Sequence, residues 1–299
     1  MELYHLRTFV TVAEEGHLTR AAERLFTSQP AISAHVKALE EELGVTLFDR
    51  TPKGMQLTAA GAQLLVKAQR ALAAAGDLMD EARSLRGEVV GEVRIGLNSD
   101  AEFLRVAAIQ TALSAAHPRL SVAFIGGSTE VNLPALRVGR LDAAFTSGVM
   151  TDPAIEVVVL GEEALAVGVP ARLRGTFDAA DVSALAAQPW VLTSPDCSHY
   201  GAIRALFDAH GCEPRQKVLA DQEDAVLAMV KAGAGLGVIR RDKIDAGDDR
   251  IDALPLALPP VPLNFTYPRR RANDPLIQAL VSTICQVWEV APPAVQLAG

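Results

Sequence analysis

The sequence has little of what marks a membrane, exported or disulfide-bonded protein. No apolar run approaches the roughly 20 residues that a membrane-spanning helix requires. The segment from Met1 to Arg7 has no basic stretch followed by an apolar core and a small-residue cleavage site, so it does not resemble a secretory signal. The three cysteines, Cys197, Cys212 and Cys285, are too few and too scattered for a disulfide framework. These absences predict a cytoplasmic protein with no membrane partner.

Metal-ligand spacing and a broad basic surface are also missing. The six histidines show no metal-binding pattern, so we expect no metal site. The net charge is −8, and residues 1–58 carry six Lys or Arg against eight Asp or Glu. A domain that binds nucleic acid usually shows a domain-wide excess of positive charge. Here the positive charge is local, because no acid lies between Arg24 and Glu40, a window that contains His35 and Lys37.

The first 60 residues carry three apolar stripes at the spacing of helices that bury one face. The stripes span residues 6–13, 18–25 and 32–43. Gly16 separates the first two, Ser28 and Pro30 suit the N-cap and first turn of the third, and Gly44 suits its C-terminal end. Three short helices with a tight turn before the third predict a helix-turn-helix, whose third helix enters the major groove. Residues 45–57 predict a short hairpin after it.

Side chains near the start of the predicted third helix suit contact with DNA. Those outside the apolar stripe are small or form hydrogen bonds: Ser28, Gln29, Ala31, Ser33, His35 and Lys37. Gln29 matches bidentate pairing with adenine, and the small side chains of Ala31 and Ser33 allow a close approach of the backbone. The hairpin tip is expected to bring Arg50 and Lys53 to phosphates.

These residues lie in a run that resembles a known family. Residues 3–65 resemble the LysR-type transcriptional regulators. The resemblance is carried by the run Leu25–Ser33, by Arg20-Ala21-Ala22 before it, and by Leu39-Glu40, Leu43-Gly44, Leu47-Phe48, Arg50 and Leu57–Gly61 after it. The resemblance implies a winged helix-turn-helix on double-stranded DNA, with contacts from Gln29, Pro30, Ser33, Lys37 and Arg50. Many members have Gln and then Arg or Lys where this chain has His35-Val36-Lys37, so we expect a changed base preference and pH-sensitive binding. The alternative is a small helical domain that binds a protein partner.

A long helix is predicted from Thr58, a suitable N-cap, to about residue 86. Residues 59–87 contain no proline, and two sets of apolar residues recur every seven positions: Leu64, Ala71, Leu78 and Leu85, and Leu65, Leu72 and Met79. This spacing is typical of a coiled-coil seam. We therefore predict a linker helix over 59–87 that joins two copies of the chain, after a DNA-binding domain over 1–58. The alternative is a core helix within one domain.

After residue 87 strands and helices alternate. Strands are expected at 89–97, 121–125, 143–145, 155–160, 164–169, 190–193, 217–220, 235–239 and 263–266, and helices at 101–116, 128–139, 199–210, 223–231 and 274–290. This alternation predicts an α/β domain with a mostly parallel sheet and helices on both faces.

Three segments of this region, 91–96, 136–144 and 229–239, resemble the sensing domain of the same family, which is similar to a type-2 periplasmic binding protein. The resemblance implies a two-lobed domain over 88–299, with lobe one at 88–162 and 267–299 and lobe two at 163–266. It also implies a small-molecule effector between the lobes, a tetramer built from two dimers, and RNA polymerase as a further partner. Arg240-Arg241 stands where many relatives have a proline.

Candidate effector contacts are expected in the loops at the carboxyl ends of strands, where ligands of open α/β sheets bind. These loops contain Asn98, Ser99, Asp100, Ser128, Thr129, Thr146, Ser147, Ser194, Ser198, His199, Asp221 and Gln222. Helix N-termini near residues 100, 128 and 199 favour an anion. Acids such as Asp100 and Asp221 instead favour an amino or guanidino group on the effector. The alternative for Asp100 is that its carboxylate caps a helix.

Three other functions have less support. A redox switch would use Cys197, which lies roughly where peroxide-sensing members of the family have a reactive cysteine, but Leu206 and Phe207 occupy the region of its partner. An enzyme would need Cys197 and His199 to act as nucleophile and base, or the glycines of residues 233–237 to hold a phosphate, but those glycines precede a strand and do not link a strand to a helix. A free-standing solute-binding protein would lack the N-terminal module. We therefore predict no enzyme but a DNA-binding transcription regulator that an effector controls.

Overall fold

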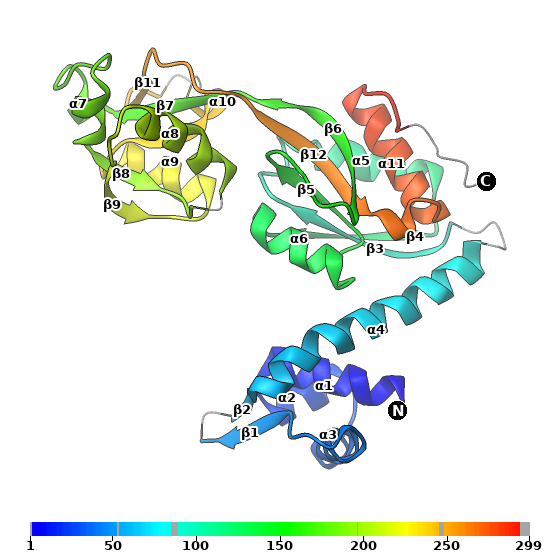
Figure 1. The fold of residues 1–299 in the computed structure, drawn as a ribbon. Coiled ribbons are helices and arrows are strands. Elements are labelled where there is room, and N and C mark those ends of the chain that lie inside the picture. Colours follow the sequence, from blue (N-terminus) through cyan, green and yellow to red (C-terminus); the bar gives the residue numbers. More distant parts are fainter. Residues whose placement is uncertain (1, 53, 85–88, 196, 245–247, 294–299) are drawn as a thin grey trace. The chain divides into compact units, whose positions relative to one another are not determined.

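The computed structural model describes residues 2–52, 54–84, 89–195, 197–244 and 248–293. The chain divides into two compact units, one comprising Met1–Glu88 with Ala135–Arg140 and the other Val89–Pro134 with Leu141–Gly299. Figure 1 shows the helices and strands of each. The predicted boundary at residues 87 and 88 lies outside the described residues.

The N-terminal unit contains three short helices and a hairpin, as the sequence predicts. The elements are α1 (Leu3–Glu15), α2 (Leu18–Arg24), α3 (Gln29–Leu43), β1 (Phe48–Thr51) and β2 (Gly54–Leu57), with β1 and β2 antiparallel. The Ser28 hydroxyl accepts a hydrogen bond from the Ala31 amide at 3.3 Å and so caps α3. Gly16 and Gly44 end α1 and α3 with φ of 67° and 68°, left-handed values that glycine adopts without strain.

Helix α4 (Ala59–Ser84) begins at the predicted cap, where the Thr58 hydroxyl accepts from the Gly61 amide at 2.9 Å. The first half of the predicted seam packs within the unit. Ala68 is buried in the core around Phe9 and Ile32, and Leu65 and Leu72 are partly buried against it. In this half the apolar spacing therefore closes the core of the helix-turn-helix, and pairing with a second copy along it stays a prediction.

The second half of α4 differs from the first. Leu78 and Met79 are 71% and 57% exposed, although the heptad spacing continues through them. An apolar pair exposed near the end of a long helix has no packing partner within the described part of this unit. This half therefore leaves apolar side chains exposed at the seven-residue spacing, as a surface that pairs with a second helix requires.

Lobe one of the second unit is built on a five-stranded sheet with the order β4-β3-β5-β12-β6. The strands are β3 (Gly91–Leu97), β4 (Leu120–Gly126), β5 (Ala143–Ser147), β6 (Ile155–Glu163) and β12 (Val261–Pro268). The helices are α5 (Val106–Ala116), α6 (Thr129–Arg137) and α11 (Pro275–Trp288), with the short turn η2 (Arg269–Arg271). Apolar residues of α5 and α11 form one core with the sheet, and the two helices lie together in Figure 1.

Lobe two is built on two small sheets, β10-β7-β11 and β8-β9, joined by a bridge between Trp190 and Leu236. Its strands are β7 (Leu165–Pro170), β8 (Pro189–Leu192), β9 (Arg215–Leu219), β10 (Gly237–Arg240) and β11 (Ile251–Ala253). Its helices are η1 (Ala171–Leu173), α7 (Val182–Ala186), α8 (Ser198–Ala209), α9 (Glu223–Lys231) and α10 (Arg241–Ile244). Trp190 and Phe207 pack edge to face in its core, at a ring separation of 5.4 Å.

Two predictions about this unit are wrong. The sheets are not mostly parallel: β3 pairs parallel with β4 and β5, whereas β12 runs antiparallel to β5 and β6, and β7 is antiparallel to both its neighbours. The helix expected from residue 101 begins only at Val106. Arg105 adopts a left-handed φ of 54°, and the preceding residues form a turn instead.

Candidate DNA-binding surface and effector cleft

The N-terminal part of α3 presents a polar edge. Gln29, Pro30 and Lys37 are exposed, and the partly buried Ser33 accepts a hydrogen bond from Arg50 Nη2 at 3.2 Å. We call Gln29, Pro30, Ser33 and Lys37 the recognition edge. Because Arg50 lies on β1, this bond brings the hairpin and the recognition edge together at the same surface.

The other predicted DNA contacts are placed less uniformly. Ser28 uses its hydroxyl as the α3 cap, Ala31 is partly buried, and Lys37 pairs with Glu41 at 3.4 Å on the helix surface. Lys53 lies outside the described residues. An exposed i,i+4 pair contributes only a few tenths of a kcal/mol, so Lys37 stays available to a phosphate.

His35 is turned toward α1. Its Nδ1 lies 3.1 Å from the Thr8 hydroxyl, and its ring is 4.9 Å from Tyr4 and 5.4 Å from His5. Burial, and then the nearby charge of His5, lower the pKa of His35 below its ordinary value. The ring thus packs between α3 and α1, and its expected contact with DNA stays a prediction.

A cleft of about 330 Å³ lies between the two lobes. Lobe one lines it with Asn98, Ser99, Asp100 and Ser128, together with Leu97, Gly126 and Gly127, and lobe two lines it with Asp221, Gln222, Glu223 and Asp224. Six of the twelve predicted effector residues therefore come together here. The other six, Thr129, Thr146, Ser147, Ser194, Ser198 and His199, do not line this cleft.

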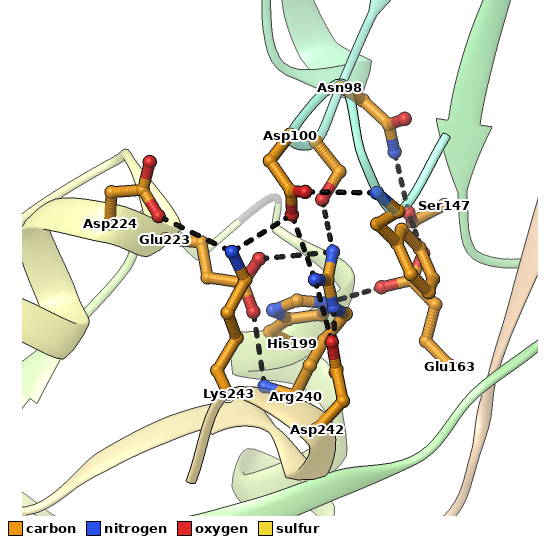
Figure 2. Close-up of polar contacts among 12 residues, drawn as sticks. Asn98, Asp100, Ser147, Glu163, His199, Glu223, Asp224, Arg240, Asp242 and Lys243 are labelled. Carbon is orange, nitrogen blue, oxygen red and sulfur yellow. Dashed lines mark hydrogen bonds and ion pairs between the residues drawn. The ribbon is translucent and has the colours of Figure 1, made fainter. Parts of the chain in front are cut away.

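Several of the residues beside the cleft form a chain of hydrogen bonds across the lobes, which Figure 2 shows. Asn98 Nδ2 donates to the Ser147 hydroxyl at 2.6 Å, and that hydroxyl donates to Glu163 Oε1. The second oxygen of Glu163 lies 2.9 Å from His199 Nε2. Glu163 is only 2% exposed, and these two hydrogen bonds supply polar partners to both oxygens of its buried carboxyl group.

Two further predicted residues, Thr129 and Ser194, hold loops beside the cleft, and a third, Thr146, lies in β5. The Thr129 hydroxyl accepts from the Ser147 amide at 2.9 Å, and the Ser194 amide donates to Asp221 at 3.1 Å. Thr146 is fully buried, and its hydroxyl finds no hydrogen-bond partner among the described residues. Asp221 therefore fixes the loop before α8 while it also lines the cleft.

Asp100 closes the turn before α5 instead of capping a helix, and it has cationic partners within the chain. One oxygen accepts from the Phe103 amide at 2.9 Å, and the other lies 2.8 Å from Arg240 Nη2 and 3.1 Å from Lys243 Nζ. Burial opposes the charged form of Asp100, but these hydrogen bonds outweigh it and hold the pKa well below its ordinary value. The cation that we expected on the effector is thus present in the protein itself.

Sequence reasoning missed five charged residues in and beside the cleft, of which Asp224 lines it from lobe two. Glu163, Glu223, Arg240 and Lys243 lie in or beside strands and helices of lobe two and at its junction with lobe one. The one available signal is Arg240, an arginine directly after the apolar residues of a predicted strand. Its partners in lobe one lie about 140 residues away in the sequence, a separation that no local pattern reveals.

The cysteines are spaced too widely for a switch between Cys197 and Cys212. Cys197 precedes α8 and Cys212 follows it, and the 12 residues of α8 span about 18 Å. A disulfide requires Cα atoms within about 7 Å. All three cysteines are free.

Among the described residues, no helix is both long and apolar enough to cross a membrane, and no group of His, Cys, Asp and Glu is arranged to hold a metal ion.

A helix-turn-helix with an exposed recognition edge, followed by a long helix and a two-lobed α/β domain with a polar cleft, defines a DNA-binding regulator that a small molecule controls. Family models agree. Residues 3–62 match the "bacterial regulatory helix-turn-helix protein, lysR family", and residues 86–289 match the "LysR substrate binding domain". The chain belongs to the LysR family of transcriptional regulators, and it is a regulator rather than an enzyme.

Named relatives are similar over most of the chain. The regulator TfdS of Cupriavidus pinatubonensis is 31% identical over 242 residues, which cover 80% of this chain and 82% of TfdS. Full-length CbnR complexed with its target DNA is 26% identical, with a TM-score of 0.63 over 96% of this chain and 99% of CbnR. A full-length OxyR variant from Pseudomonas aeruginosa is 25% identical, with a TM-score of 0.68 over 100% of this chain and 99% of the OxyR chain.

Proposed function

We propose that the recognition edge contacts base pairs in the major groove, with Gln29 and Ser33 toward the bases and Lys37 and Arg50 toward phosphates. The observation that supports this most is the hydrogen bond between Arg50 and Ser33, which gathers cation and hydroxyl on one exposed surface. Because residues 1–58 together carry two more acids than bases, this local positive charge has to supply the attraction to the phosphates.

The substitution Ser33→Arg tests the proposal by placing a long side chain in the middle of the recognition edge. We expect specific binding to the DNA upstream of the gene to be lost in a gel shift, while the sedimentation profile of the protein stays unchanged. Glu41→Gln is the matched control, since removal of this carboxylate changes the net charge of α3 by the same one unit further along the helix. Normal footprints from Ser33→Arg would contradict the placement of α3.

We infer that two copies of the chain pair through the second half of α4, where Leu78 and Met79 are exposed. Pairing would present two recognition edges to two half-sites, the arrangement that symmetric operators require. The tetramer and the contact with RNA polymerase rest on the family resemblance alone and stay predictions.

We also propose that the effector occupies the cleft of about 330 Å³, held by hydroxyl and amide groups of Asn98, Ser99, Ser128 and Gln222. This volume is in the lower part of the range, roughly 300–1,000 Å³, of small-molecule pockets. Both lobes supply lining residues, so a ligand there contacts both at once and has a means to change their closure.

Calorimetric titration with a panel of amino acids and simple aromatic acids tests this site. Any compound that binds the native chain is expected to lose its binding to Ser128→Trp, because the indole fills the cleft. Ser114→Trp on the exposed face of α5 is the matched control. A compound that bound Ser128→Trp as tightly as the native chain would place the effector site elsewhere.

A further inference from the structure

Arg240 is a buried arginine that reaches from one lobe to the other. It ends β10 in lobe two, and its side chain is only 1% exposed. Burial of a guanidinium is costly unless charges and hydrogen bonds replace the lost water. The surroundings of this one residue therefore have to supply that compensation.

Lobe one supplies three of the contacts. Arg240 Nη1 donates to the Ser99 hydroxyl, Nη2 lies 2.8 Å from Asp100 Oδ2, and the guanidinium carbon lies 3.6 Å from the centre of the Phe103 ring. The short segment Asn98–Asp100, which we call the wall loop, also lines the cleft. The guanidinium thus contacts the loop that forms one side of the effector site.

Lobe two supplies the remaining contacts. Arg240 lies 3.1 Å from Asp242 and 3.4 Å from Glu223, and its own amide donates to Glu223 at 3.1 Å. Lys243 adds a second cation to Asp100 at 3.1 Å. Figure 2 shows these groups converging on the guanidinium and on Asp100 from the two lobes.

We infer that Arg240 is a positioning residue that docks the wall loop onto lobe two and so sets the shape of the cleft before any effector binds. This inference rests on the proposed use of the cleft as the effector site. Separation of the lobes would remove Ser99, Asp100 and Phe103 from the guanidinium at once. The resting protein therefore holds its cleft partly closed with its own charges, and the effector acts on this closed arrangement.

Hydrogen exchange of the full-length chain without effector tests the inference. The amides of residues 103 and 104 bond to Asp100 of the wall loop, and those of residues 105 and 106 bond to the turn directly after it, so these four amides report the loop and its turn. In Arg240→Met, which keeps the length of the side chain without its charge, we expect these amides to exchange about tenfold or more faster. Amides of β3 and β12 should exchange at their native rates. Arg241→Met changes an exposed neighbour and is the matched control.

Two further variants separate positioning from general stabilisation. Arg240→Lys keeps a cation that reaches Asp100, so it should restore part of the protection at 103–106. Asp100→Asn removes the charge on lobe one with little change of shape. Combined with Arg240→Met it should add little, since both break the same contact.

Exchange at 103–106 within about twofold of native in Arg240→Met would overturn the inference. So would an equal acceleration throughout β3 and β12, since this would show a general loss of stability. If Arg240→Met does not fold, the exchange of the same amides is measured in Asp100→Asn alone, and the same limits apply. These measurements use no effector. If the effector binds elsewhere, the proposed function is refuted, but the measurements still test the role of Arg240.

Discussion

The exposed pair Leu78 and Met79 allows the strength of the proposed pairing to be worked out. Full burial of a Leu or Met side chain contributes about 1.5–3 kcal/mol. The two residues are 71% and 57% exposed, so covering what is exposed contributes about 2–4 kcal/mol per helix and about 4–8 kcal/mol for two helices. Since each 1.4 kcal/mol is a factor of about ten, this corresponds to roughly three to six orders of magnitude in the dimer dissociation constant.

The double substitution Leu78→Glu with Met79→Glu replaces this apolar contact by four carboxylates that repel one another. We expect sedimentation equilibrium at micromolar concentration to show a monomer, and binding to a two-half-site DNA to weaken accordingly. The fold of the N-terminal unit should remain, since neither side chain belongs to its core.

The matched control is Ala62→Glu with Gln63→Glu, which places two carboxylates on exposed positions of the same helix nearer its start. This control should stay dimeric. If the Leu78→Glu, Met79→Glu protein sedimented as a dimer with an unchanged dissociation constant, the pairing surface would lie elsewhere on the chain.

Two further predictions concern the N-terminal unit. Because the pKa of His35 is lowered in the fold, the unfolded chain takes up a proton first as the pH falls. The unit should therefore lose stability as the pH drops from 7.5 through the ordinary pKa of about 6.5. Calorimetry at a series of pH values should show a flatter dependence of stability on pH for His35→Gln. A dependence as steep as that of the native chain would contradict this role of His35. Phe26 is 98% exposed with a left-handed φ of 52°, so Phe26→Asn should relieve strain without loss of packing and raise the free energy of unfolding by about 1 kcal/mol. A lower thermal midpoint for Phe26→Asn would contradict that account of the turn.

Local signals in the sequence predict local structure well in this chain. Ser28 and Thr58 act as the caps that their positions indicate, and α9 has the bounds that the sequence predicts, because each depends on neighbours within a few residues. The predicted start of α5 is wrong because the sequence offers no local signal for the left-handed residue before it. The periodicity continues upstream of Val106, but the left-handed Arg105 interrupts the helix.

Patterns that depend on distant partners were harder to interpret. The seven-residue spacing along α4 is the same whether Leu65 faces a second copy or the core of its own unit, so sequence alone does not separate the two. The contacts of Arg240 with Asp100 and of Glu163 with His199 join segments far apart in the chain. The cleft loops were found by position, whereas the charges that hold them were not.

The anchoring of α4 has a mechanical consequence. Its first half is fixed to the helix-turn-helix through Ala68, so the helix and the recognition edge turn together as one stiff lever. From Ala68 to the end of α4 the lever extends about 24 Å. A tilt of about 10° at the far end would sweep about 4 Å, close to the spacing of roughly 3.4 Å between successive base pairs. In the proposed pair of copies, a tilt of this size would therefore displace a recognition edge by about one base-pair spacing.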